Sequence, residues 1–148
     1  YANKGDCMSS NCIFCKIVNK DIPSVTVYED DIIIAFLDIS QATKGHTLII
    51  PKNHYENVFD IDKAVISHIH KHVPKIARAI TKAFCANGIN IVNNNGASAG
   101  QTVFHYHVHL IPRYDNGDGF NLIYTNNMDK YSKEDLSYIA EDIIKALS

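Results

Sequence analysis

Apolar residues in the first third of the chain are spaced as in short β-strands. Residues 25–29, 32–37 and 46–50 form three such segments, each bounded by residues typical of turns or by a proline. From residue 62 to residue 86 the apolar spacing changes to three and four, which predicts one long amphipathic helix. Pro74 lies inside this helix, so we expect a kink or a local break there.

The second half of the chain returns to strands and ends on a helix. Residues 89–92 and 102–111 have the composition of strands, the polar residues 93–100 form a loop between them, and Pro112 is expected to end the second strand. Ser132 is suited to cap a last helix that has one apolar face. This order predicts an α+β fold, with an antiparallel β-sheet, a long central helix and a C-terminal helix.

Length and charge then limit the kind of protein. The 148 residues suit a single domain, which we expect over residues 12–148, with residues 1–11 as a tail that is disordered or foreign to the natural protein. A net charge of −2 offers no broad basic surface, so we expect no nucleic-acid partner. The sequence has no apolar run long enough for a membrane span and no signal-peptide pattern, so we expect a cytoplasmic protein with reduced cysteines.

The segment from Phe104 to Leu110 alternates strictly between apolar residues and histidines. In a strand, alternate side chains point to opposite faces, so His105, His107 and His109 would share one face. Imidazoles titrate near neutral pH and act as nucleophiles, proton donors and metal ligands, so this row favours a catalytic or binding site. A plain solvated face is the weaker interpretation, because histidine has no special preference for strands.

The polar loop before these histidines carries groups that suit an anion. Asn94, Gln101 and Thr102 bring amides and a hydroxyl, and Gly100 leaves its backbone N–H unhindered. Such groups stabilise developing negative charge on oxygen. A loop of this composition is by itself also typical of a simple turn.

Three further histidines have the same spacing inside the predicted helix. In a helix, residues two apart do not share a face, so His68, His70 and His72 cannot form a row. His68 and His72 are four apart and can meet, which allows a metal-binding pair. An exposed helix surface is the interpretation that the sequence favours.

Cys12 and Cys15 are separated by two residues, which suits a tetrahedral zinc site that needs two further ligands. His54, just after a predicted strand, is one candidate. A redox pair and two unused thiols are the alternatives, although a redox pair usually lies beside a βαβ unit, which this sequence does not predict.

Residues 101–111 resemble the signature of the histidine triad family, in which three histidines alternate with apolar residues. Residues 36–40, 45–52 and 93–96 agree with the same family, and the resemblance covers residues 12–113. It implies a HIT-like fold and a hydrolase.

In that family, the residue matching His107 attacks the α-phosphorus of an adenosine nucleotide and forms a nucleotidyl-histidine intermediate, from which water releases the nucleoside monophosphate. His109 would contact the phosphate or assist the leaving group. The substrates implied are adenosine phosphoramidates or dinucleoside polyphosphates, and the sequence does not separate them.

The resemblance also implies residues that bind the nucleotide. Asp38 would hold the ribose hydroxyls, and Phe36 and Ile39 would flank the adenine. His46 would lie near the α-phosphate. The phosphate and leaving group would meet Asn94, Gly100, Gln101 and Thr102. The first four of these residues also have a purely structural interpretation. Asp38 would then be a turn residue and His46 would cap a strand edge. Phe36 and Ile39 would belong to the core.

The resemblance further implies a structural zinc ion, no organic cofactor, and a homodimer with a strand and the central helix at its interface. In zinc-bearing members the matching histidines complete the site, which gives the ligand set Cys12, Cys15, His54 and His105. Two alternatives stay open for the whole chain, a non-catalytic nucleotide-binding protein and a zinc-stabilised interaction module.

Overall fold

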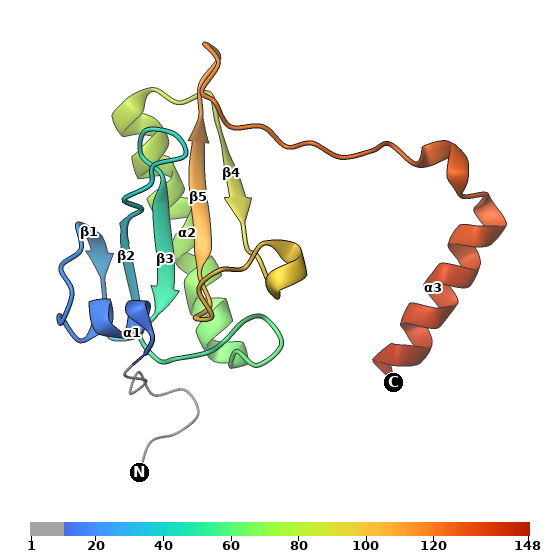
Figure 1. The fold of residues 1–148 in the computed structure, drawn as a ribbon, viewed down its shortest axis with the longest axis horizontal. Coiled ribbons are helices and arrows are strands. Elements are labelled where there is room, and N and C mark those ends of the chain that lie inside the picture. Colours follow the sequence, from blue (N-terminus) through green and yellow to red (C-terminus); the bar gives the residue numbers. More distant parts are fainter. Residues whose placement is uncertain (1–10) are drawn as a thin grey trace.

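Five short strands form one antiparallel sheet in the order β1-β2-β3-β5-β4 (Figure 1). The structure is a computed structural model that describes residues 11–148, so residues 1–10 of the predicted tail lie outside the described residues. The sheet confirms the predicted α+β fold. The strands are β1 (Thr26–Glu29), β2 (Ile33–Leu37), β3 (Thr47–Pro51), β4 (Gly88–Val92) and β5 (Val108–Arg113).

The long helix α2 (Lys63–Phe84) covers one face of the sheet (Figure 1). Asp62 caps its start by accepting the backbone N–H groups of Ala64 and Val65. The predicted break at Pro74 is wrong, because the helix runs through this residue. Proline leaves only the carbonyl four residues earlier without its helical partner, and that residue, His70, is exposed to water. The core on this face comprises Ile33, Ala35, Ile49, Ile69, Val73, Ile76, Ile80, Tyr106, Val108 and Leu110.

A short helix that the sequence did not predict, α1 (Ile13–Val18), covers the other face. Cys12 caps it, since its Sγ accepts the backbone N–H of Cys15 at 3.4 Å. The core on this face comprises Phe14, Ile17, Ile34, Phe36, Leu48 and Ile50. Both faces of the central strands are therefore buried, which explains why β2 is apolar along its whole length and β3 is apolar from Leu48 onward.

The predicted strand 102–111 is wrong at both ends. Residues 102–107 form a loop, because β3 and β4 pair with β5 only from Val108 onward. Pro112 does not end the strand. Its carbonyl accepts the Thr43 hydroxyl at 2.6 Å, on the side away from β4. In a strand, the backbone nitrogen of a residue points to the same side as its carbonyl. The N–H that Pro112 lacks would therefore not have paired with β4, and no hydrogen bond between β5 and β4 is lost.

The predicted C-terminal helix is present as α3 (Lys133–Leu147), capped by a reciprocal pair of hydrogen bonds between Ser132 and Asp135. It stands apart from the sheet at the end of an extended segment (Figure 1). All of its residues are exposed. Among residues 11–148, no helix combines the length and the apolar character that a membrane crossing requires.

Replacing Gly45 with alanine is expected to lower the free energy of unfolding by about 1–2 kcal/mol. Gly45 has a φ of +98°, and a Cβ there would lie 2.9 Å from Cδ2 of Phe84. Urea unfolding measures the change. The matched control is Gly88→Ala, whose Cβ would meet no atom within 4 Å. Equal effects of the two substitutions would contradict this explanation.

Candidate active site and metal centre

The histidines of the alternating segment do not share one strand face as predicted. His105 and His107 lie in the loop before β5, and only His109 lies in the strand. The rings of His107 and His109 still stand 4.9 Å apart. The structure therefore divides the row, with His105 beside two cysteines and the other two histidines together.

His107 is buried, and one of its ring nitrogens is held by the backbone. Its Nδ1–H donates to the His105 carbonyl at 2.7 Å, so Nε2 carries the free lone pair. Burial lowers the pKa of His107, although this hydrogen bond and the charge of Asp38 act in the opposite direction. The neutral ring at neutral pH has the form that a nucleophile needs.

A hydrogen-bond chain fixes the tautomer of His109. The backbone N–H of Ala42 donates to His46 Nδ1 at 3.1 Å, so His46 Nε2 bears the proton and donates to His109 Nδ1 at 2.9 Å. His109 is left with Nε2–H, a proton donor. Ala42 acts through its backbone, so no side-chain pattern in the sequence pointed to it.

Acidification is expected to destabilise the protein because His109 is a partly buried neutral ring. Burial, together with the charges of His107 and His46, lowers the pKa of His109 to about 4, against 6.5 for an exposed histidine. Between these values the unfolded chain binds a proton that the folded chain does not. The free energy of unfolding therefore falls as the pH falls through this window. Urea unfolding across the window measures it, and a stability that stays constant or rises on acidification would contradict the assignment.

An apolar pocket of about 260 Å³ lies between α1 and the end of β2. Phe36 lines it from the sheet, and Asp38 and Ile39 lie at the residues that follow β2. Phe14 forms another wall, and its ring lies 5.1 Å from the ring of His107. The predicted adenine and ribose residues are thus brought together one side chain away from His107. The sequence did not point to the other lining residues, which are Ile13, Phe14, Ile17, Ile22, Pro23, Ser24, Leu37, Leu48 and Val103.

Asp38 and Ile39 differ in how firmly they are held. Asp38 accepts the backbone N–H of Ser40 at 2.7 Å, and its other oxygen lies 3.6 Å from His46 Nε2. Ile39 is 99% exposed, so its side chain contributes nothing to the core.

The four predicted loop residues are placed differently from one another. The Gln101 amide donates to the carbonyls of Glu56 and Val103 and accepts the N–H of Gly96, so it stabilises the loop itself. Thr102 lines a hollow beside Cys12 and His54. Gly100 has a φ of +89°, and its Cβ position lies 4.0 Å from the Asn94 side chain. Phosphate contacts by these residues stay predictions.

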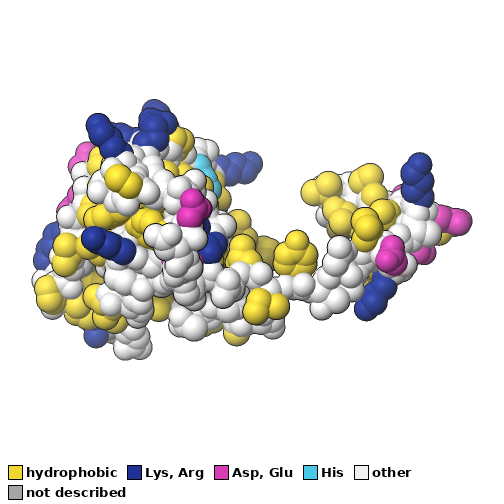
Figure 2. Space-filling view, turned by 90° about the horizontal axis from the view of Figure 1, so that it is seen from above, with side chains coloured by type: hydrophobic (Ala, Val, Ile, Leu, Met, Phe, Trp, Pro, Cys, Tyr) yellow, Lys and Arg dark blue, Asp and Glu magenta, His cyan; other side chains and the backbone are white. Residues whose placement is uncertain are grey.

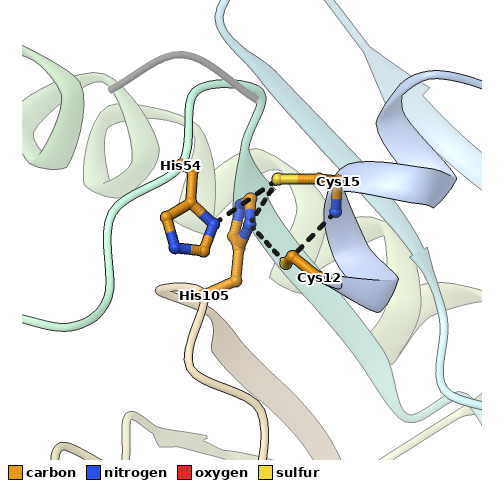
Figure 3. Close-up of side chains that lie close together, drawn as sticks. All are labelled: Cys12, Cys15, His54 and His105. Carbon is orange, nitrogen blue, oxygen red and sulfur yellow. Dashed lines mark hydrogen bonds between the residues drawn. The ribbon is translucent and has the colours of Figure 1, made fainter. Parts of the chain in front are cut away.

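Two cysteines and two histidines converge from three separate segments (Figure 3). Cys12 Sγ lies 3.3 Å and Cys15 Sγ 3.6 Å from His105 Nδ1, and Cys15 Sγ lies 3.4 Å from His54 Nδ1. Tetrahedral zinc bound by sulfur and nitrogen holds such atoms about 3.6 Å apart. The predicted ligand set therefore has the donors and the spacing of a structural zinc site.

His105 joins this cluster to His107. Its Nε2–H donates to the Pro51 carbonyl at 2.8 Å, which leaves Nδ1 facing the sulfurs. Burial, with smaller contributions from His54 and His107, lowers the pKa of His105 to about 4, so the ring is neutral as a ligand must be. Cys15 is disulfide-bonded in this structure, so zinc binding requires its reduction to the thiolate.

Comparison with known proteins gives a consistent set of relatives. The profile of a family described as "HIT domain" matches residues 19–116. The chain is 54% identical over 140 residues to "Protein hit" of Bacillus subtilis, covering 95% of this chain and 97% of that protein. It is 42% identical over 106 residues to "Adenylylsulfatase HINT3" of Arabidopsis thaliana, covering 72% of this chain and 54% of that protein.

Solved structures agree with these relatives. A crystal structure of a HIT family member from Bacillus subtilis has a TM-score of 0.90 and 55% identity, and the match covers 94% of this chain and 99% of that one. A zinc-bound histidine triad family protein from Mycobacterium smegmatis has a TM-score of 0.71 and 36% identity, with coverage of 80% and 86%.

Proposed function

The chain belongs to the HIT domain family, and on this premise we propose that it hydrolyses nucleoside phosphate derivatives through a nucleotidyl-histidine intermediate on His107. One observation carries the proposal. The Nδ1–H of His107 donates to a backbone carbonyl, and Nε2 of a neutral ring is left as the nucleophile beside His109, whose Nε2–H is a hydrogen-bond donor. The related adenylylsulfatase supports hydrolysis as the class of reaction.

The two histidines divide the reaction into two displacements. In the first, Nε2 of His107 attacks the α-phosphorus and the bond to the leaving group breaks, while His109 Nε2–H donates a hydrogen bond to that group, which takes its proton from solvent. In the second, water attacks the phosphorus and releases its proton to solvent. The phosphorus–nitrogen bond to His107 breaks, and the nucleoside monophosphate leaves. The hydrogen bond from His46 keeps the proton of His109 on Nε2 in the resting state.

The apolar pocket gives the nucleoside a place beside His107. An adenine ring suits the apolar surface of Phe36 and Phe14, and the Asp38 carboxylate suits ribose hydroxyls as an acceptor. Ile39 would close over the base from its exposed position. We place the α-phosphate near His46, His107 and His109, and the leaving group near Asn94, Gly100 and Thr102.

The position of Arg113 favours small leaving groups. Arg113 follows the histidine motif, and contact of this residue with further phosphates would need a free guanidinium. Here that guanidinium donates to Asp118 at 2.8 Å, to Asn90 at 2.7 Å and to the Phe120 carbonyl at 2.6 Å. An adenosine phosphoramidate or an adenylylsulfate fits this arrangement better than a dinucleoside polyphosphate.

Release of AMP from these three substrates at equal concentration tests the proposal. We expect turnover, fastest with the phosphoramidate or the sulfate. Faster cleavage of the dinucleoside polyphosphate would overturn the substrate preference. AMP that binds without any substrate being cleaved would favour a nucleotide-binding protein, and zinc binding without AMP binding would favour an interaction module.

For the Cys and His cluster we propose a structural zinc ion held by Cys12, Cys15, His54 and His105. The zinc-bound relative from Mycobacterium smegmatis supports this metal. Four protein ligands leave no position for substrate, so the ion would fix the loop that carries His105 and His107. Reduced thiolates are the state expected in the cytoplasm, where we place the protein.

We also propose that the chain forms a homodimer through α3. Apolar side chains gather on one side of this helix, which stands apart from the sheet (Figure 2). A single helix of 15 residues is marginal in water without packing. A second copy offers charge complementarity, because α2 carries five basic and no acidic residues, whereas α3 carries four acidic and two basic ones.

Replacing Ile139 and Ile143 together with glutamine is expected to convert a dimer into a monomer. These side chains lie four residues apart on α3 and are 43% and 58% exposed. Sedimentation equilibrium measures the mass. The control variant replaces the two basic residues of α3, Lys133→Gln with Lys145→Gln, which take no part in the charge complementarity, and should stay dimeric. A monomeric parent protein would contradict the proposal.

A further inference from the structure

A third histidine cluster lies on the face of the sheet opposite the nucleotide pocket. Asp30 follows β1, and His68 and His72 lie one turn apart on α2. The ring centroids of the two histidines are 4.4 Å apart. One ligand atom from each of the three side chains lies within 4.8 Å of the others. Neither the nucleotide pocket nor the Cys and His cluster uses these residues.

The backbone holds the carboxylate of Asp30 in place. Its Oδ1 accepts the N–H groups of Ile32 and Ile33 at 2.8 and 2.9 Å. Its Oδ2 accepts the Tyr28 hydroxyl at 2.9 Å and faces the two histidines. Hydrogen bonds of this kind orient a carboxylate that binds a metal.

Both histidines present Nε2 to this oxygen. His72 donates Nδ1–H to the His68 carbonyl at 2.9 Å, so Nε2 is the nitrogen that can offer a lone pair to a metal ion. That nitrogen lies 3.9 Å from Asp30 Oδ2, and His68 Nε2 lies 2.8 Å from the same oxygen. A cation fits between the His72 nitrogen and the carboxylate oxygen, either a proton on His72 or a metal ion that both atoms bind.

We propose that Asp30, His68 and His72 bind a divalent transition metal ion such as Zn²⁺ or Co²⁺, at a site separate from the Cys and His cluster. Two imidazoles and one carboxylate are donors that suit these ions. Tetrahedral zinc keeps nitrogen and oxygen ligands about 3.4 Å apart, and the two distances in the cluster lie on either side of this value. Small side-chain shifts therefore suffice.

Binding replaces the proton on His68 Nε2, which is released to solvent. The three side chains are between 19% and 25% exposed, so water can reach the ion and complete its coordination. Such a site is open to a further ligand, unlike the closed four-residue cluster. It would also join the turn after β1 to α2.

Counting bound metal in reduced, metal-free protein tests the proposal. With Zn²⁺ we expect two ions per chain for the parent protein and one for His72→Ala. The His72→Ala variant keeps the hydrogen bond between His68 and Asp30, so it should fold, which circular dichroism checks. The matched control is His70→Ala, an exposed histidine on the same helix, and it should keep two ions.

Co²⁺ identifies which site each ion occupies. Thiolate ligands give cobalt an intense charge-transfer band, whereas imidazole and carboxylate ligands give only weak visible bands. We expect both signatures in the parent protein, with only the weak bands lost in His72→Ala. A parent protein that binds a single ion with the thiolate band, or a His72→Ala variant that keeps both ions, would overturn the proposal.

Discussion

Replacing His107 with asparagine is expected to lower the rate of AMP release by at least about 1,000-fold. The imidazole Nε2 is the atom that forms the bond to phosphorus, and asparagine has no equivalent nucleophile. Its amide N–H can still donate to the His105 carbonyl, which His107 Nδ1 contacts at 2.7 Å. The fold and the nucleotide pocket should therefore be preserved, and AMP binding by calorimetry checks that they are.

The matched control is His70→Asn, the same substitution on the exposed surface of α2. It should leave the rate unchanged. Equal AMP release from His107→Asn and the parent protein would remove His107 from the reaction. Loss of both AMP binding and activity would show instead that the substitution had damaged the pocket.

Replacing Cys12 with serine is expected to remove the zinc ion and much of the stability that it supplies. At free zinc of 1,000 times the dissociation constant, binding to the folded state alone contributes about 4 kcal/mol. AMP release should also slow, because His105 would bind the proposed zinc ion through its ring and holds His107 through its carbonyl. Zinc content, urea unfolding and turnover are the three measurements.

Serine is chosen because it removes a metal ligand without removing the cap of helix α1. Cys12 caps α1, and serine is among the best residues for that position. The control is Cys85→Ser, at an exposed cysteine outside the cluster. If the parent protein showed the same unfolding with zinc and with a chelator under reducing conditions, the structural role of the metal would be contradicted.

Local patterns predicted most of the fold. The three early strands and the long helix agree with the structure within two residues at each end, because their apolar spacing matches their burial. The capping residue Ser132 placed the start of α3 correctly. The helix α1 was missed because it is only six residues long and depends on contacts with the sheet.

The alternation around the histidines gave the right residues for a partly wrong reason. Residues 102–107 alternate like a strand, but no strand lies beside them, so the backbone bends and sends His105 and His107 to different partners. Alternation along the sequence predicts which side chains share a face only where the segment is hydrogen-bonded to a neighbouring strand. The family resemblance, rather than the period, identified His105 as the residue that meets Cys12 and Cys15.

Contacts between residues far apart in the chain determine the features of the site that the sequence could not predict. The tautomer of His109 depends on Ala42 and His46, which are more than 60 residues away. The commitment of Gln101 to backbone groups depends on Glu56, 45 residues away. From the sequence, the histidine pair on α2 is predicted to be exposed surface. In the structure, the turn after β1 places Asp30 against it.

The configuration at phosphorus tests the central claim most directly. A substrate made chiral at the α-phosphorus by isotopic oxygen or sulfur is hydrolysed, and the configuration of the released nucleotide is determined. Two successive displacements, first by His107 and then by water, predict retention. Inversion would mean that water attacks phosphorus in one step, and it would contradict the covalent intermediate on His107.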